Sequence, residues 1–336
     1  MKAILRAVIV SSVALASTTS FALEKVKIGI LNGASAFISL VADGKGYLKD
    51  AGIEADFVIF DSGAKMIPSI ATGGLDIGIG AASSALYNAV GRGMGVKIVA
   101  DALRNSPGVG QSVMVRSDLL DTGQVKSLKD LKGKTFAITA FASSEAASLD
   151  RAMRSVGYTF DDVEKLYAGF PDHVVAFQNK AIDAALTGEP FGTLAADKGV
   201  ARAFMMVGEY YPNQETSVMM FASTFGDQKR ELGVKFLVAY LRATSAYITA
   251  RKDGFLTGPG ADEIVNLLAD RSSVKNVGLL KRMRANGIDP NGNLNVDALE
   301  EDFAFFKARG QIEGSVKVSD AIDLSFLKAA QQRVRQ

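Results

Sequence analysis

The stretch Ile70–Ser84, IATGGLDIGIGAASS, carries the pattern that decides the fold. It ends one helix at a Gly-Gly pair, continues as a short apolar strand at 77–80, and begins the next helix with two serines. The same order of strand and helix repeats on both sides of this stretch. Strands that are joined through helices favour a parallel sheet with right-handed crossovers. We therefore expect an α/β protein.

Two successive units of the chain show this alternation. In the first unit the sequence predicts strands at 26–31, 55–60, 77–80 and 96–100, and helices at 37–51, 66–72 and 83–90. In the second unit it predicts strands at 135–139, 163–166, 184–186 and 203–207, and helices at 143–156, 173–179 and 191–198. Beyond Ser223 the pattern becomes helical, with helices predicted at 227–252, 262–270, 275–285, 296–309 and 320–334.

Extended segments at 113–116 and 218–222 flank the second unit. Two such crossings suit a domain that is inserted into another domain, with both strands acting as a hinge. We predict that residues 23–113 form the first part of lobe I and that residues 114–217 form lobe II. Residues 218–336 would then complete lobe I with a return strand and the C-terminal helices.

The composition excludes several classes of protein. The 336 residues are 48% hydrophobic and 22% charged, which is typical of a globular chain with about two domains. The net charge of +2 does not indicate binding to nucleic acid. The absence of Cys excludes disulfides, thiolate nucleophiles and Cys-based metal sites. A single histidine, His173, argues against a multi-His metal site and against Ser-His-Asp chemistry.

The N-terminal segment Met1–Ala22 has the pattern of a secretory signal peptide. Lys2 and Arg6 precede an apolar run at 7–16, and small residues lead up to a cleavage site near Ala22. The uncharged run is short and rich in Ser and Thr for a membrane anchor. Both charges of the net +2 lie in this segment, so the chain from Leu23 is formally neutral. We expect a soluble periplasmic protein.

Polar segments follow the predicted strands at the edge where open parallel sheets bind their ligands. Ser83 and Ser84 in one unit, and Ser143 and Ser144 in the other, begin helices whose free backbone N–H groups can hold a polar ligand. Each of these serines also suits a helix N-cap. The residues predicted to line a cleft between the units are Asn32, Ser35, Phe37, Asp61, Ser62, Ala82, Ser83, Ser84, Phe141, Ser143, Ser144, Glu189, Pro190 and Tyr210.

Several of these residues have a second interpretation. Glu189 contacts a ligand amine or hydroxyl, or it fixes its own turn through backbone amides. Asp61 has the same two roles open to it, and Tyr210 is either an aromatic wall or a tyrosine buried under a loop. His173 is expected at the start of a helix. There it is either a surface or capping residue or a residue that hydrogen-bonds in the cleft. A role as a catalytic base is the weakest alternative, because such a base needs a nucleophile and an orienting group nearby.

One motif imitates a dinucleotide-binding fingerprint. Gly78-Ile79-Gly80-Ala81-Ala82-Ser83 lies between a strand and a helix, and Asp101 follows at the end of the next strand. Ser83 replaces the third small residue of the fingerprint, and a secreted chain meets little NAD. An NAD-linked periplasmic enzyme therefore stays only as the weakest alternative, and no cofactor is expected.

Five segments together resemble a known family. They are KIGI at 27–30, GYLKDAGI at 46–53, IATGGLDIG at 70–78, LKDLKGK at 128–134 and GEPF at 188–191. In this order, and behind a signal peptide, they are similar to the substrate-binding proteins of ABC importers for nitrate, sulfonates, taurine and thiamine-precursor pyrimidines. The resemblance covers nearly all of the mature chain.

The resemblance implies a two-lobed type II periplasmic-binding-protein fold that closes on its ligand by a hinge. It also implies docking to the membrane subunits of an ABC permease, and no enzymatic activity. Ligand contacts would fall near 35–37, 61–63, 82–84, 141–144 and 189–190. The sulfonate-type members often have an aromatic residue where this chain has Glu189. An acidic side chain would repel an anion, which favours a ligand with a hydrogen-bond donor.

We expect a monomeric solute-binding protein that delivers a small polar organic solute, of the sulfonate, carboxylate or nitrogen-heterocycle class, to an ABC permease. A ligand-sensing module for a membrane receptor is the second alternative, and the sequence does not separate it from transport.

Overall fold

The computed structural model describes residues 22–335. The predicted signal peptide therefore lies, except for Ala22, outside the described residues. None of the helices within 22–335 combines the length and the apolar character that a membrane span requires.

The first sheet is five-stranded and mixed. Its order is β2 (Ile53–Phe60), β1 (Glu24–Leu31), β3 (Ile77–Gly80), β10 (Gln214–Ala222) and β4 (Val96–Asn105). β1 pairs in parallel with β2 and β3, as predicted, whereas β10 runs antiparallel to β3 and β4. β10, for which the sequence predicted a return strand without a direction, runs against its neighbours because it enters the sheet from the other lobe.

The second sheet has the same construction. Its order is β7 (Glu164–Tyr167), β6 (Thr135–Ile138), β8 (Ala184–Thr187), β5 (Ser112–Arg116) and β9 (Ala201–Met206). β6 pairs in parallel with β7 and β8, and β5 is antiparallel to β8 and β9. Alternate residues of its strands face two separate apolar cores, with Val113 and Val115 in one core and Met114 in the other.

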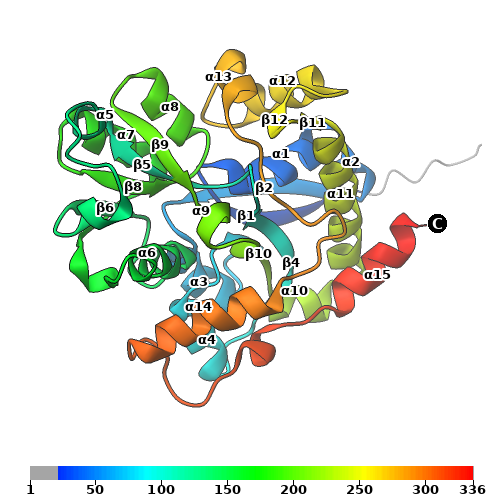
Figure 1. Ribbon diagram of the computed structural model, residues 1–336. Helices are drawn as coiled ribbons and strands as arrows, with labels where there is room; N and C mark the ends of the chain where they lie inside the picture. Colours follow the sequence, from blue (N-terminus) through cyan, green and yellow to red (C-terminus); the bar gives the residue numbers. More distant parts are fainter. Residues whose placement is uncertain (1–21, 336) are drawn as a thin grey trace, which may run out of the picture.

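Two crossings connect the lobes (Figure 1). They run from Asn105 to Ser112 and from Met206 to Gln214, so they fall a few residues from the predicted boundaries, which lie inside β5 and β10. The crossings are adjacent in space, because the Asn213 N–H donates to the Asn105 carbonyl at 2.6 Å and the Val207 N–H donates to the Gln111 carbonyl at 3.0 Å. These two neighbouring crossings are called the hinge segments, or the hinge, below.

Helices cover both sheets. In lobe I they are α1 (Phe37–Gly44), α2 (Tyr47–Asp50), α3 (Gly63–Ala71) and α4 (Ser84–Gly91). In lobe II they are α5 (Ser117–Asp121), α6 (Ser144–Arg154), α7 (Phe170–Gln178), α8 (Phe191–Asp197) and the short α9 (Val207–Tyr210). The predicted helix at 37–51 is divided, because Gly46 adopts a left-handed conformation with φ of 75°.

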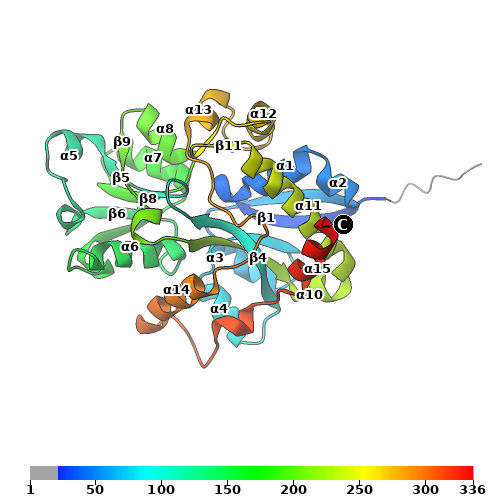
Figure 2. The same ribbon diagram turned by 45° about the vertical axis from the view of Figure 1, so that its right-hand side comes forward.

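The C-terminal extension is helical, as expected, and it packs mainly on lobe I (Figure 2). It contains α10 (Ser223–Gln228), α11 (Arg230–Thr249), α12 (Ala261–Arg271), α13 (Val277–Arg282), α14 (Val296–Ala308) and α15 (Ser325–Val334), with a small hairpin of β11 (Arg251–Lys252) and β12 (Phe255–Leu256). The predicted helix at 227–252 is divided at Lys229, which leaves the helical conformation. In Figure 1 α14 lies below α6 of lobe II, and the two helices pack against each other.

Candidate functional site

A cavity of about 580 Å³, counting the open space at its mouth, lies between the lobes. Lobe I contributes the ends of β1 and β3, the start of α3 and the middle of β10, and lobe II contributes the ends of β6 and β8 and the starts of α6 and α7. The loop after α13 adds Arg284 and Asn286. The cavity therefore lies at the carboxyl ends of parallel strands, where such sheets bind ligands.

Hydrogen bonds join the lobes around this cavity. The Ala34 N–H of lobe I donates to the Glu189 carbonyl of lobe II at 2.8 Å, and the Ser84 N–H donates to the Ala142 carbonyl at 3.2 Å. The ideal Cβ position of Gly33 lies only 3.3 Å from the ring of Phe170. The structure is therefore a closed form in which the two lobes touch.

The walls carry buried polar groups that have free hydrogen-bonding capacity. Ser35 is 6% exposed and Gln111 is 6% exposed, and the Ser35 Oγ and Gln111 Oε1 atoms have no hydrogen-bond partner within 22–335. Ser62 caps α3 without using its side chain to do so. Buried polar atoms normally find partners. A polar ligand in the cavity would supply them.

Glu145 forms an acidic part of the lobe II wall. Its carboxylate accepts hydrogen bonds from the Thr139 N–H at 2.6 Å, from the Thr139 hydroxyl at 2.7 Å and from the Gln111 amide at 3.2 Å. Burial raises the pKa of Glu145, and these three hydrogen bonds act in the opposite direction. The cavity wall thus holds a carboxyl group that is enclosed by uncharged donors.

Glu189 forms a second acidic part of the same wall. Its carboxylate accepts hydrogen bonds from the Thr193 N–H and the Thr193 hydroxyl, each at 3.0 Å. Its side chain is half-buried, and burial raises its pKa against the opposing effect of Thr193 and Arg284. Glu189 therefore fixes the start of α8 and also faces the cavity, so both of its predicted roles are compatible with the structure.

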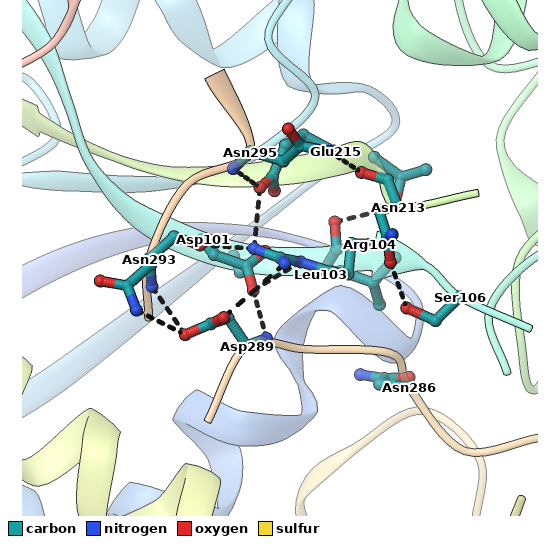
Figure 3. A network of polar contacts seen from close by, with 12 residues as sticks. Asp101, Leu103, Arg104, Ser106, Asn213, Glu215, Asn286, Asp289, Asn293 and Asn295 are labelled. Atoms are coloured by element: carbon teal, nitrogen blue, oxygen red, sulfur yellow. Dashed lines mark hydrogen bonds and ion pairs between the residues drawn. The ribbon is translucent and has the colours of Figure 1, made fainter. Parts of the chain in front are cut away.

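A network of charged side chains lies next to the hinge (Figure 3). Arg104 of β4 contacts Glu215 at 3.0 Å, Asp101 at 3.4 Å and Asp289 at 3.7 Å. Burial raises the pKa of Glu215 well above its usual range, and the nearby Asp101 raises it further. Because Leu103 and Thr216 line the cavity beside these residues, the network holds the lobe I wall in place.

Four of the predicted site residues line the cavity. These are Ser35, Ser62, Ser143 and Glu189. The first three are nearly inaccessible to solvent, and Ser143 donates its hydroxyl to the Ala140 carbonyl at 3.0 Å.

Four others lie close by, in contacts between the lobes or next to a wall residue. Ser84 and Ser144 hydrogen-bond across the cleft, the latter through its hydroxyl to the Thr216 carbonyl at 3.3 Å. Pro190 follows Glu189 directly and precedes α8. The Asn32 side chain accepts a hydrogen bond from the Ser273 hydroxyl of the C-terminal extension.

The remaining predicted residues lie away from the cavity. Phe37 and Ala82 belong to the apolar core of lobe I. Ser83 is completely buried, and its hydroxyl has no hydrogen-bond partner among the described residues. Asp61 is exposed and pairs with Lys65 at 2.6 Å. These side chains follow the correct strands, but they point into the core or into solvent because adjacent residues in a turn face different directions.

The predicted aromatic residues also lie elsewhere. Phe141 is 48% exposed and packs against Phe160 and Tyr167. Tyr210 packs against the core of lobe II, which is the second interpretation that the sequence left open. The aromatic wall is instead Phe170, at the start of α7, whose ring covers Gly188.

Sequence reasoning missed most of the wall. Glu145 follows Ser143 and Ser144 directly, so the first turn of that predicted helix was a usable signal for it. Gln111 lies in a hinge crossing, and Thr216 and Arg284 return to the cavity from distant parts of the chain. No local pattern places those residues in the cleft.

The structure gives the apparent dinucleotide fingerprint a packing role. Gly80 approaches Gly63 so closely that its ideal Cβ would lie 2.8 Å from the Gly63 Cα. Asp101 is completely buried and accepts a hydrogen bond from the Asp289 N–H at 2.6 Å. The glycines therefore allow α3 to pack on β3, and Asp101 is not accessible to a ribose.

Comparisons with known proteins identify the same architecture. A model of the family described as NMT1/THI5 like matches residues 35–252. A search of curated protein sequences gives no match. The alkanesulfonate-binding protein SsuA from Xanthomonas axonopodis pv. citri, bound to MOPS, is 17% identical with a TM-score of 0.70, and the similarity covers 89% of this chain and 98% of that one.

Two further solved structures are similar to this chain. The periplasmic nitrate-binding protein NrtA from Synechocystis PCC 6803 is 13% identical with a TM-score of 0.74, covering 93% of this chain and 89% of that one. The desulfurization enzyme DSZB is 16% identical with a TM-score of 0.61, covering 92% and 99%. At these identities the likeness shows the fold alone, and it confirms the predicted periplasmic-binding-protein fold.

Proposed function

The chain belongs to the NMT1/THI5-like family, and from this premise we propose that it is a periplasmic solute-binding protein that passes a small polar organic solute to an ABC permease. The observation that carries the proposal is the interlobe cavity, whose walls come from both lobes and contain buried polar atoms that find no partner among residues 22–335. A solute that contacts both walls stabilises the closed form over the open one. Its release would accompany opening at the permease.

Binding without catalysis agrees with the chemistry of the walls. His173 is the only histidine, and both of its ring nitrogens are engaged, with Nδ1 3.1 Å from the Thr187 hydroxyl and Nε2 3.0 Å from the Ala168 carbonyl. It therefore does not serve the cavity serines as a general base. The desulfurization enzyme DSZB has a similar fold, so the fold alone does not separate binding from catalysis. The proposal therefore rests on the residues of the site.

Native mass spectrometry of the freshly purified protein tests the proposal. We expect an adduct of one small organic molecule, which is released by denaturation and rebinds to the refolded protein. Ser217 of β10 lines the cavity, as Ser62 does. In calorimetry, the double variant Ser62→Ala/Ser217→Ala should bind the recovered solute at least about tenfold more weakly, which corresponds to about 1.4 kcal/mol.

Ser83→Ala is the matched control. Ser83 is buried like Ser62, but it lies outside the cavity, so its loss should change the affinity less than about twofold. The proposal is wrong if no solute accompanies the protein and none in an extract of the source cells binds to it.

A further inference from the structure

The charged residues of the cavity wall are Glu145, Glu189 and Arg284. This set has one more acidic group than basic groups, and it indicates the kind of solute that fits. The inference below rests on the proposed function, because it assigns a chemical class to the solute of the same cavity.

Gln111 and Glu145 form a corner that accepts hydrogen bonds. The Gln111 amide nitrogen donates to Glu145, which leaves the buried Gln111 Oε1 as an acceptor without a partner among the described residues. Glu145 is 4% exposed and lies in the first turn of α6. The N-terminus of a helix attracts anions, and at the N-terminus of α6 the carboxylate of Glu145 already lies there.

Glu189 adds a second carboxylate to the wall. The groups that hydrogen-bond to the carboxylates of Glu145 and Glu189 are N–H groups, hydroxyls and an amide, which carry no formal charge. A carboxylate removed from water without a cationic partner is costly, and a cation close to it lowers that cost. A bound solute with a positive charge would provide this partner.

Arg284 is the basic residue of the cavity wall, and an aromatic ring engages its side chain. Its guanidinium stacks over the ring of Phe255 at 4.4 Å. The ideal Cβ position of Gly254 lies 3.0 Å from the Arg284 Nη1 atom, and Gly254 and Arg284 both line a second hollow. Arg284 thus lowers the pKa of Glu189, and it is the single basic residue among the described residues of the cavity wall, against two acidic ones.

We infer that the solute carries a cationic, N–H-donating nitrogen group, such as an amidinium, which faces Gln111 and the carboxylates of Glu145 and Glu189. A monocation balances the single excess negative charge of the wall, and its N–H groups supply donors to the free acceptors. An anion of the same shape would leave two excess negative charges in a closed cavity.

Isosteric pairs of compounds test this inference, because they differ mainly in charge. The probes are acetamidinium against acetate and benzamidinium against benzoate, with nitrate and ethanesulfonate as further anions, titrated calorimetrically into the emptied protein. The amidinium of at least one pair should bind at least tenfold more tightly than its carboxylate. Glu189→Gln and Glu145→Gln should each reduce this preference to less than about threefold.

Asp61→Asn is the matched control, because it removes the same charge from an exposed residue at the edge of lobe I. It should leave the preference unchanged. The inference is wrong if a carboxylate, nitrate or ethanesulfonate binds as tightly as the amidinium, or if neither amidinium binds. An anionic solute recovered by mass spectrometry would also overturn it while leaving the proposed function intact, whereas the absence of any bound solute would overturn both.

Discussion

His173 shows how burial decides the role of a single residue. The sequence indicated a residue at the start of a helix, but α7 already begins at Phe170, and His173 lies within its first turn, completely buried. Burial lowers the pKa of His173 to about 4. Its neutral ring therefore joins α7 to β8 through Thr187 and to the Ala168 carbonyl.

This pKa predicts a loss of stability in acid. The unfolded chain binds a proton at His173 below a pH of about 6.5, whereas the folded chain does so only near pH 4, so the free energy of unfolding falls as the pH decreases through this interval. At pH 4.5 the loss from His173 is about 2–3 kcal/mol. Urea denaturation measures the free energy of unfolding at pH 7 and at pH 4.5. Between these two values it should decrease less in His173→Gln than in the unmodified protein, by about 2–3 kcal/mol. Equal decreases in both proteins would contradict the prediction.

At the scale of the residue, the sequence was a partial guide to the site. It located the segments after the strands, and Ser35, Ser62, Ser143 and Glu189 do line the cavity. It could not decide which side chain of a turn faces inward, and Ser62 and Asp61 show this, because one is buried in the wall and its neighbour is exposed.

At the scale of the element, β4 and β10 carry the link between the lobes. They pair along most of their length, with irregular register near Ser217, and Arg104 of β4 contacts Glu215 of β10 and Asp101 of its own strand (Figure 3). The direction of β10 could not be read from its own sequence, because it depends on the return of the chain from lobe II.

Loss of Arg104 should strongly destabilise this pair of strands. Arg104→Met leaves the buried Asp101 and Glu215 without their cation, so the free energy of unfolding should fall by about 3–5 kcal/mol. Arg92→Met removes the exposed pair with Glu313 and should cost at most about 1 kcal/mol. Urea denaturation of both variants measures the difference, and equal losses would show that the network does not stabilise the hinge.

At the scale of the whole molecule, the C-terminal extension adds further contacts between the lobes. Arg309, which directly follows α14, donates to Asp161 of lobe II at 2.8 and 2.9 Å, and Phe305 of α14 packs against Phe160 with ring centroids 5.9 Å apart. The Tyr211 hydroxyl near the hinge donates to Asp302 of α14 at 2.9 Å. The sequence predicted the two lobes and the helical extension, but not that the extension would reach lobe II and the cavity, because these contacts join residues more than 80 positions apart.

Small-angle X-ray scattering tests the central claim most directly, namely that the solute holds the two lobes closed around the interlobe cavity. The chain has no Trp, so scattering reports the change of shape better than intrinsic fluorescence. The protein is measured after its solute has been removed and again after saturation with the recovered solute. We predict that the radius of gyration decreases on saturation, and that Ser62→Ala/Ser217→Ala requires at least about tenfold more solute for the same decrease. An unchanged radius of gyration, with calorimetry showing the solute bound in a one-to-one complex, would contradict the account.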